Sequence, residues 1–244
     1  MNLFYLLFAV FIPAVVSIID GELVTNIEKY KHMVRIQYHK TPKISRYICG
    51  ATVLSKNLIA TAAHCVHKKM LFTLIFGTTN LDKPYHTVNV TDLDIVIHPE
   101  YAGGAPSYRH DIAMIELKEN LTFDSNIGQA ELAGKNYVLK TGDTVTMLGY
   151  TEATHPTRQI IDRTHLRSVS SRVEDFQNCR NSYSKRMKGL LLDQQQFCVS
   201  LRGKKKHNTN HGDSGGPILT KDGKLIGTAS FNFDGLPEVY VFVN

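Results

Sequence analysis

The sequence lacks three features that would place it in other classes of protein. After residue 16 it has no apolar run long enough to span a bilayer, which excludes a helical membrane protein. It shows no internal repeat and no low-complexity tract, which argues against a repeat protein. Its net charge of +6 comes from scattered basic residues with one cluster at 202–206, which we interpret as a solvated loop. Nucleic acid is therefore not an expected partner.

The remaining composition is that of a soluble globular protein. The 244 residues are enough for one large domain or two small ones, and 43% of them are apolar. Residues 3–16 are almost wholly apolar, too few to span a membrane but enough for the apolar region of a signal peptide. Because Val15 and Ser17 suit the positions three before and one before cleavage, we expect residues 1–17 to be a signal peptide and the mature protein to be secreted.

Secretion changes how the cysteines and asparagines are interpreted. The chain has only four cysteines, an even number that permits three pairings: Cys49, Cys65, Cys179 and Cys198. In an oxidising compartment, two disulfides are a better interpretation than a metal site. Two N-glycosylation sequons, at Asn89 and Asn120, also gain meaning only in a secreted chain.

Strand-like segments dominate the chain and predict an all-β protein. Short alternating or β-branched runs, separated by Gly, Pro, Asn and Asp, cover residues 32–39, 71–77, 86–97, 111–117, 143–150, 218–231 and 239–243. Asp222 and Gly223 lie between two apolar runs and predict a tight hairpin turn. A helix is predicted over 171–183, with Ser171 and Glu174 as a capping box. Residues 124–140 have few strand signals and are expected to connect two β units of similar size.

Three motifs carry the chemistry, in the chain order His, Asp, Ser. His64 lies in TAAHC, Asp111 in HDIAMIEL and Ser214 in HGDSGGP. A serine hydroxyl is a poor nucleophile until a base takes its proton, and histidine, with an ordinary pKa of about 6.5, is suited to that task. A buried aspartate can hold the histidine in the right tautomer and stabilise the imidazolium.

The turn around Ser214 also predicts an oxyanion hole. Its glycines let the backbone point amide hydrogens at a developing oxyanion, with Gly212 and Ser214 as the donors. Each motif alone has a plain structural explanation, such as a histidine packed beside a cysteine or an aspartate that caps a strand. An acid, a serine and three glycines within six residues, together with the other two motifs, are much harder to explain in that way.

These motifs resemble those of the trypsin-like (chymotrypsin-fold) serine proteases, and the resemblance covers residues 18–243. It implies an all-β fold of two six-stranded antiparallel β-barrels with the active site between them and one short intermediate helix. The protease domain would occupy residues 18–244, with one barrel over about 28–125 and the other over about 137–244.

The resemblance also implies roles for individual residues. His64 would be the general base, Asp111 would orient it, and Ser214 would attack the scissile carbonyl. The cysteines would pair as Cys49–Cys65 and Cys179–Cys198.

The boundary between signal peptide and protease is unusual. In this family the mature chain begins with a motif like Ile-Val-Gly-Gly, and here Ile18-Ile-Asp-Gly occupies that place. The resemblance implies that the freed Ile18 ammonium pairs with Asp213 and orders the turn that carries the oxyanion donors. Relatives have Arg or Lys before the Ile, whereas this chain has Ser17. We therefore hypothesise that signal peptidase itself creates the active terminus; a cut a few residues earlier would leave a blocking tail.

Four positions are expected to shape the substrate pocket: Asn208, Ser230, Asn232 and Glu238. By the resemblance, Asn208 lies at the base of the pocket, where trypsins have an aspartate. Ser230 and Asn232 flank Phe231, which replaces the usual Trp, on the strand that pairs with the substrate. Glu238 stands where most relatives have a glycine, and its carboxylate would either hold a Lys or Arg side chain or point to solvent. We expect a basic or a mixed basic and aromatic preference.

Three other family features are missing. The loop before Glu238 lacks the cysteine that ordinarily ties it to the position of Asn210. The sequence stops at Asn244, so the carboxy-terminal helix of the relatives is not expected. The loop after Phe76 lacks the acidic pair that binds calcium in trypsins, so we expect no metal and no cofactor.

The sequence thus predicts a secreted serine endopeptidase that works through an acyl-enzyme. Its partners would be protein or peptide substrates and protein protease inhibitors, without nucleic acid or membrane, and it would act as a monomer. The alternative is a catalytically silent protease homologue that acts as a binding or decoy protein. Such homologues usually have a substituted Ser, His or Asp, and all three residues are present here. The missing disulfide, the missing helix and the unusual activation boundary keep the alternative open.

Overall fold

The computed structural model describes most of the chain: residues 21–41, 43–101, 103, 108–153, 160–162, 164–187, 190, 192–200, 212–233 and 235–243. The predicted signal peptide and three residues of the sequence argument, Ile18, Asn208 and Asn210, lie outside the described residues.

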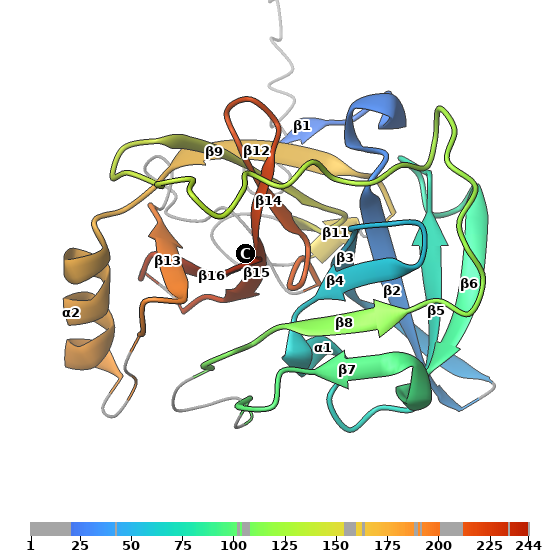
Figure 1. Ribbon diagram of the computed structural model, residues 1–244, viewed down its shortest axis with the longest axis horizontal. Helices are drawn as coiled ribbons and strands as arrows, with labels where there is room; N and C mark the ends of the chain where they lie inside the picture. The colour runs from blue at the N-terminus through green and yellow to red at the C-terminus, as the bar shows by residue number, and fades with distance from the viewer. Residues whose placement is uncertain are drawn as a thin grey trace, which may run out of the picture.

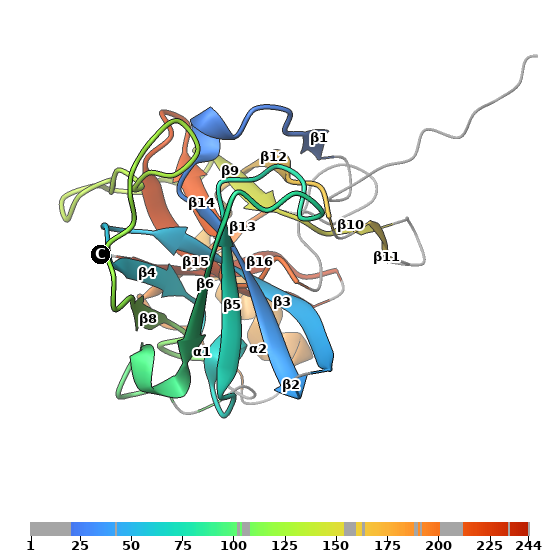
Figure 2. The same ribbon diagram turned by 90° about the vertical axis from the view of Figure 1, so that its right-hand side faces the viewer.

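In the described residues, two curled antiparallel β-sheets of seven strands each make up the fold, with the first on the right and the second on the left of Figure 1. The first sheet has the order β6-β5-β2-β3-β4-β8-β7 and contains β2 (Met33–Thr41), β3 (Ile44–Val53), β4 (Leu58–Thr61), β5 (Leu71–Phe76), β6 (His86–Thr91), β7 (Ile95–Ile97) and β8 (Ala113–Glu116). Figure 2 shows β6, β5, β2 and β3 of this sheet side by side.

The second sheet is built mainly from the later part of the chain. It has the order β1-β12-β9-β14-β15-β16-β13 and contains β1 (Glu22–Leu23), β9 (Thr144–Gly149), β12 (Arg167–Arg172), β13 (Gln196–Val199), β14 (Pro217–Thr220), β15 (Leu225–Phe231) and β16 (Glu238–Phe242). A separate pair is formed by β10 (Glu152–Ala153) and β11 (Ile160–Asp162).

The predicted all-β fold of two antiparallel barrels is confirmed. Each sheet has seven strands rather than the expected six because a very short strand, β1 in one and β7 in the other, extends an edge. The amino-terminal β1 pairs with β12, with Glu22 opposite Ser168, so the start of the described chain joins the second sheet.

Buried apolar side chains fill each sheet and the junction between the two sheets. One cluster lies inside the first sheet and includes Val34, Phe72 and Ile115, and another lies inside the second. A third cluster joins residues of both sheets, among them Met33 and Leu148. Burial of this apolar area is the main force that holds the two sheets together.

The described residues contain two α-helices. The first, α1 (Ala63–Val66), is a single turn that carries His64, and the second, α2 (Phe176–Arg186), packs beside β13 at the far left of Figure 1. No helix in the described ranges is long and apolar enough to cross a membrane.

The helix near residue 175 was predicted, but its predicted start was wrong. Asp175 is the N-cap, because its side chain accepts a hydrogen bond of 2.8 Å from the backbone N–H of Asn178. Ser171 instead belongs to β12 and donates to the Ser200 carbonyl, while Glu174 accepts from the Ser200 hydroxyl. The strand therefore ends inside the predicted capping box, at Arg172, and the helix begins after Asp175.

Both disulfides have the pairing that the resemblance implied. Cys49–Cys65 joins β3 to α1, and Cys179–Cys198 joins α2 to β13. The predicted hairpin turn is also present, since β14 and β15 pair on either side of Gly223, whose φ of +86° is one that glycine adopts readily.

Candidate active site

Two of the three predicted side chains line one cavity between the sheets, and the third, Asp111, is buried beside His64. His64 comes from α1, Asp111 lies two residues before β8, and Ser214 lies three residues before β14. His64 and Ser214 line the same cavity of about 270 Å³, together with residues of β15 and β16. The first sheet thus supplies the histidine and the aspartate, and the second supplies the serine.

Asp111 fixes the orientation of His64. The Nδ1 of His64 lies 2.8 Å from Asp111 Oδ2, and the His64 backbone N–H donates to Asp111 Oδ1 at 2.9 Å. The Ser230 hydroxyl donates a third hydrogen bond to Asp111, at 2.5 Å. Asp111 is 0% exposed, whereas the His64 side chain is 28% exposed. Because a carboxylate only accepts, the bond assigns the proton of the neutral ring to Nδ1 and leaves Nε2 as the acceptor.

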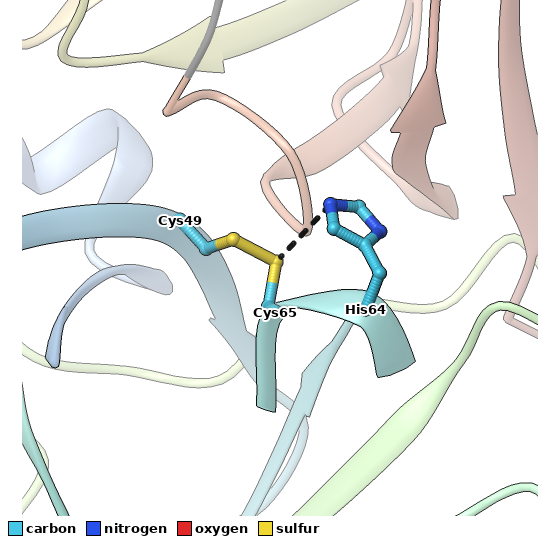
Figure 3. A group of neighbouring side chains, drawn as sticks. All are labelled: Cys49, His64 and Cys65. Atoms are coloured by element: carbon cyan, nitrogen blue, oxygen red, sulfur yellow. Dashed lines mark hydrogen bonds between the residues drawn. A yellow bond between two sulfur atoms is a disulfide. The ribbon is translucent and has the colours of Figure 1, made fainter. Parts of the chain in front are cut away.

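Backbone hydrogen bonds anchor the turn around Ser214 to both sheets. The Gly50 N–H donates to the Ser214 carbonyl at 2.7 Å, and the Gly215 N–H donates to the Ala229 carbonyl at 2.6 Å. In the described part of the chain, no hydrogen bond joins His64 Nε2 to the Ser214 hydroxyl; Nε2 lies 3.7 Å from Cys65 Sγ (Figure 3). Such bonds are often long without substrate and tighten in the reacting complex.

The disulfide beside His64 serves as a support for the ring. Figure 3 shows the Cys49–Cys65 bond directly next to the imidazole. Although Cys49, His64 and Cys65 lie close enough together to suggest metal ligation, both sulfurs are engaged in the disulfide and are not thiolates.

The two predicted oxyanion donors have amides that are available for a ligand. Among the described residues, the backbone N–H groups of Gly212 and Ser214 donate to no protein acceptor. Gly212 has a φ of +108°, and a Cβ added there would lie 2.9 Å from Thr151 Oγ1. Glycine is therefore required at this position for both conformation and space.

Arg35 contacts this turn from the first sheet, and its role was not predicted from the sequence. Its side chain is fully buried on β2, and its guanidinium donates to the Gly212 carbonyl. The guanidinium carbon also lies 5.7 Å from the ring centroids of Tyr47 and Tyr150. The signal in the sequence is a charged residue inside the apolar run Met-Val-Arg-Ile, where a buried cation needs an acceptor.

Asp213 is packed beside the end of β9. It is fully buried, and the Thr151 N–H donates to its Oδ1 at 3.1 Å. A Cβ added at Gly149 would collide with the same oxygen, so the close approach of β9 depends on glycine. Because Ile18 lies outside the described residues, its pairing with Asp213 stays a prediction.

The predicted pocket residues Ser230, Asn232 and Glu238 line the same cavity as His64 and Ser214. Glu238 is only 2% exposed and accepts hydrogen bonds from the Tyr240 hydroxyl at 2.9 Å and from Asn232 Nδ2 at 3.5 Å. It does not point to solvent, contrary to one of the two alternatives. The fourth predicted residue, Asn208, lies outside the described residues.

Aromatic side chains that sequence reasoning missed complete the wall of this cavity. Tyr108 and Phe233 line it, and the Tyr108 ring stacks on Phe231 with a centroid distance of 4.5 Å. Tyr183 lies behind Phe231; burial and then the charge of Glu238 raise the pKa of its hydroxyl, which donates to the Pro237 carbonyl at 2.6 Å.

The two sequon asparagines lie away from this cavity. Asn89 and Asn120 are exposed and line a separate hollow of about 870 Å³. Although this hollow is larger, its lining includes none of His64, Asp111 and Ser214.

The fold and this grouping of side chains define the class of the two-barrel, chymotrypsin-fold proteins. The protein-family model described as Trypsin matches residues 18–244, and the chain belongs to the trypsin family of serine proteases. Neuropsin, described as a serine protease expressed in the limbic system of mouse brain, has a similar solved structure with a TM-score of 0.74. It is 23% identical and the match covers 92% of this chain and 94% of neuropsin, which supports the fold.

Three curated relatives are similar to this chain over most of its length, and one of them is named as a serine protease. The CLIP domain-containing serine protease B4 of Anopheles gambiae is 28% identical over 241 residues, which cover 90% of this chain and 65% of that protein. Hypodermin-A of Hypoderma lineatum is 28% identical over 238 residues, which cover 92% and 84% of the two chains. The chain spans 64% of the length of a third relative, phenoloxidase-activating factor 1 of Holotrichia diomphalia, at 23% identity.

Proposed function

We propose that this chain is a secreted serine endopeptidase that hydrolyses peptide bonds through an acyl-enzyme. The observation that carries the proposal is the 2.8 Å contact between His64 Nδ1 and the buried Asp111 carboxylate, beside a cavity that Ser214 also lines. This arrangement presents His64 Nε2 as a base on the side of the serine.

The chemistry follows from these positions. Ser214 Oγ forms a bond to the scissile carbonyl carbon while His64 Nε2 takes the hydroxyl proton. The carbonyl electron pair moves onto oxygen, where the N–H groups of Gly212 and Ser214 stabilise the negative charge. Collapse of the intermediate expels the amine, which takes the proton from His64. Water then attacks the acyl-enzyme by the same route, and Ser214 leaves with its proton restored.

Activation would depend on the new amino terminus. The ammonium of Ile18 would pair with the buried carboxylate of Asp213 and hold the turn in its active form. The full burial of Asp213 beside the end of β9 supports this proposal, because an ion pair shielded from water is screened less than one at the surface. Signal peptidase would create this terminus by cutting after Ser17, so the enzyme would be active on secretion.

Secretion is also the basis of two smaller proposals. Asn89 and Asn120 are exposed, as glycosylation requires, and would carry N-linked glycans. The enzyme would act as a monomer on protein or peptide substrates and would be restrained by protein protease inhibitors that occupy the same cavity.

Glu238 would select the side chain of the substrate. A buried carboxylate in the cavity attracts a Lys or Arg side chain, while the neighbouring Phe231 and Phe233 would accept an aromatic one. Substrates with a basic residue before the cleaved bond should therefore lose at least tenfold in kcat/KM on Glu238→Gln, and aromatic ones should not. Profiling both variants on a peptide library measures this, with the exposed Glu119→Gln as the control.

A burst experiment with a nitrophenyl ester tests the proposed function itself. We expect a rapid release of about one nitrophenol per chain followed by slower turnover, which is the signature of an acyl-enzyme. Ser214→Ala should show no burst and should bind peptides normally. A folded wild-type protein with neither burst nor turnover on any library peptide would favour the catalytically silent homologue.

A further inference from the structure

A second cluster of chemically active side chains lies beside Asp111. His98 directly follows β7, Glu100 lies in the next turn, and His110 directly precedes Asp111. Because β7 and β8 pair antiparallel, with Ile97 opposite Ala113, the end of one strand meets the start of the other. The candidate ligand atoms of His98, Glu100 and His110 all lie within 4.8 Å of one another.

The hydrogen bonds of His110 leave a lone pair directed at a carboxylate. Its Nδ1 lies 2.9 Å from Gln195 Oε1, and because an amide oxygen only accepts, the ring must donate through Nδ1. In the neutral ring, the lone pair is then on Nε2, which lies 3.5 Å from Glu100 Oε2. Two electron-rich atoms that face each other at this distance favour a cation between them.

His98 offers a second nitrogen donor. Its Nδ1 lone pair accepts a long hydrogen bond of 3.2 Å from the Glu100 backbone N–H, which a metal ion at Nδ1 would replace. The two imidazole rings are stacked, with centroids 4.5 Å apart and planes 10° apart. Both rings are half-buried and Glu100 is 72% exposed, so an ion can reach the group from solvent.

We propose that His98, Glu100 and His110 bind a divalent transition-metal ion, with Zn²⁺ as the best match, and that this ion inhibits the enzyme. Two imidazoles and one carboxylate form a ligand set that zinc accepts, with a remaining position for water. We expected no metal from the sequence because the cysteines favoured disulfides and the calcium loop of trypsins lacked its acidic pair, but these three residues lie elsewhere.

The expected inhibition follows from the movement that zinc binding requires of its ligand atoms. Ligand atoms about 2.0–2.2 Å from zinc lie roughly 3.5 Å apart, whereas the candidate atoms here lie within 4.8 Å of one another. Because His110 Nε2 and Glu100 Oε2 are already 3.5 Å apart, closure of the site falls on His98. Two backbone hydrogen bonds link His98 to the segment that contains Asp111. The His98 N–H donates to the Ile112 carbonyl at 3.1 Å, and the Ile112 N–H donates to the His110 carbonyl at 2.7 Å. A shift of His98 therefore moves Ile112 and, with it, the neighbouring Asp111 relative to His64, and the ion selects a less active state.

The metal site can be tested without any activity. Isothermal titration with Zn²⁺ is performed on the mature protein carrying His64→Ala, which removes the active-site histidine as a competing ligand. One site is expected, with affinity reduced at least tenfold by Glu100→Gln and by His98→Gln. The control is His165→Gln, because His165 is a half-exposed histidine that also contacts a carboxylate, that of Asp162. Equal affinity in all variants would overturn the site.

The effect on activity is tested separately in protein with an intact His64. We expect Zn²⁺ to lower kcat with little change in KM, EDTA to reverse the effect, and Glu100→Gln to raise the inhibitory concentration at least tenfold. Zinc that binds with full affinity but leaves kcat unchanged would overturn the coupling to Asp111. This second test depends on the proposed function, whereas the titration does not, so a protein without peptidase activity would still decide the metal site.

Discussion

At the scale of single residues, the chemistry proposed for Ser214 depends on side chains that no short motif contains. The hydroxyl of Ser230, which is distant in sequence, donates a hydrogen bond to Asp111, and the guanidinium of Arg35, from the other sheet, donates to the Gly212 carbonyl. The three motifs predicted His64, Asp111 and Ser214 because their residue types are informative in themselves. Arg35 was not predicted because its role arises only when two distant strands pack together.

Replacement of Arg35 tests whether it positions the oxyanion turn. Arg35→Met keeps the buried volume but removes the donor to the Gly212 carbonyl, so the amide of Gly212 should lose its alignment. We expect the rate of fluorophosphonate labelling to fall by about ten- to a hundredfold, within the range of a lost oxyanion donor. Stability should change by no more than about 2 kcal/mol, because loss of the hydrogen bond is offset by removal of a buried charge.

Arg172→Met is the matched control for this prediction. Arg172 is exposed and also donates to a glycine carbonyl, that of Gly142, at 2.8 Å. Equal labelling rates in the two variants, with both folded, would show that Arg35 has no special role at the site.

His32 should make the stability of the protein depend on pH. Burial lowers the pKa of His32 to about 4, and among the described residues its Nε2 has no hydrogen-bond partner. Because this value lies below the ordinary 6.5, the unfolded chain takes up the proton first as the pH falls. The contribution of the neutral His32 to the free energy of unfolding is complete above about pH 6.5. It is lost as the pH falls toward 4, by about 3 kcal/mol.

Urea unfolding at pH 7.5 and pH 4.5 measures this effect. His32→Leu should lose less stability between the two values than the wild type, by about 2–3 kcal/mol. The exposed His86→Leu should behave as the wild type. The same pH dependence in His32→Leu as in the wild type would contradict the assignment to His32.

At the scale of secondary-structure elements, the alternating pattern predicted where strands lie better than where they end. Residues 86–97 were predicted as one strand-like run, but β6 and β7 are separated by the 3₁₀ turn Asp92–Asp94. Asp94 accepts hydrogen bonds from both the backbone N–H and the hydroxyl of Thr91, and these local bonds compete with strand pairing. Apolar periodicity carries no information on such bonds.

The two disulfides should have similar effects on stability and different effects on the site. They close loops of similar length, with sequence separations of 16 and 19, so each should contribute roughly 3 kcal/mol. Only Cys49–Cys65 holds the turn that carries His64. Replacing both of these cysteines by serine should therefore slow labelling at temperatures where the protein is folded, whereas the same change at Cys179 and Cys198 should not.

Thermal unfolding and labelling of both double variants check this prediction. Equal labelling rates at a temperature well below both transitions would mean that the disulfide beside His64 contributes only stability.

At the scale of the whole molecule, the site exists only where the two sheets meet. His64 and Asp111 belong to the first sheet, while Ser214 and the oxyanion donors belong to the second. The resemblance predicted this arrangement, because the order of the motifs is specific to the family. It did not predict the aromatic wall of the cavity, since Tyr108 and Phe233 lie in loops without a regular pattern.

The proposed activity of Ser214 depends on the freed amino terminus at Ile18. This terminus is expected to order the turn around Ser214 through Asp213, and the ordered turn would present the oxyanion donors. We therefore predict that one cut, after Ser17, is enough for activity.

The most direct test is fluorophosphonate labelling of the secreted protein, with the intact mass recorded in the same sample. We expect one adduct per chain on a polypeptide that begins at Ile18, and none on Ser214→Ala. A folded chain that begins at Ile18 and takes up no label would contradict it, because the serine would then lack the activated site that the His64–Asp111 pair is proposed to provide.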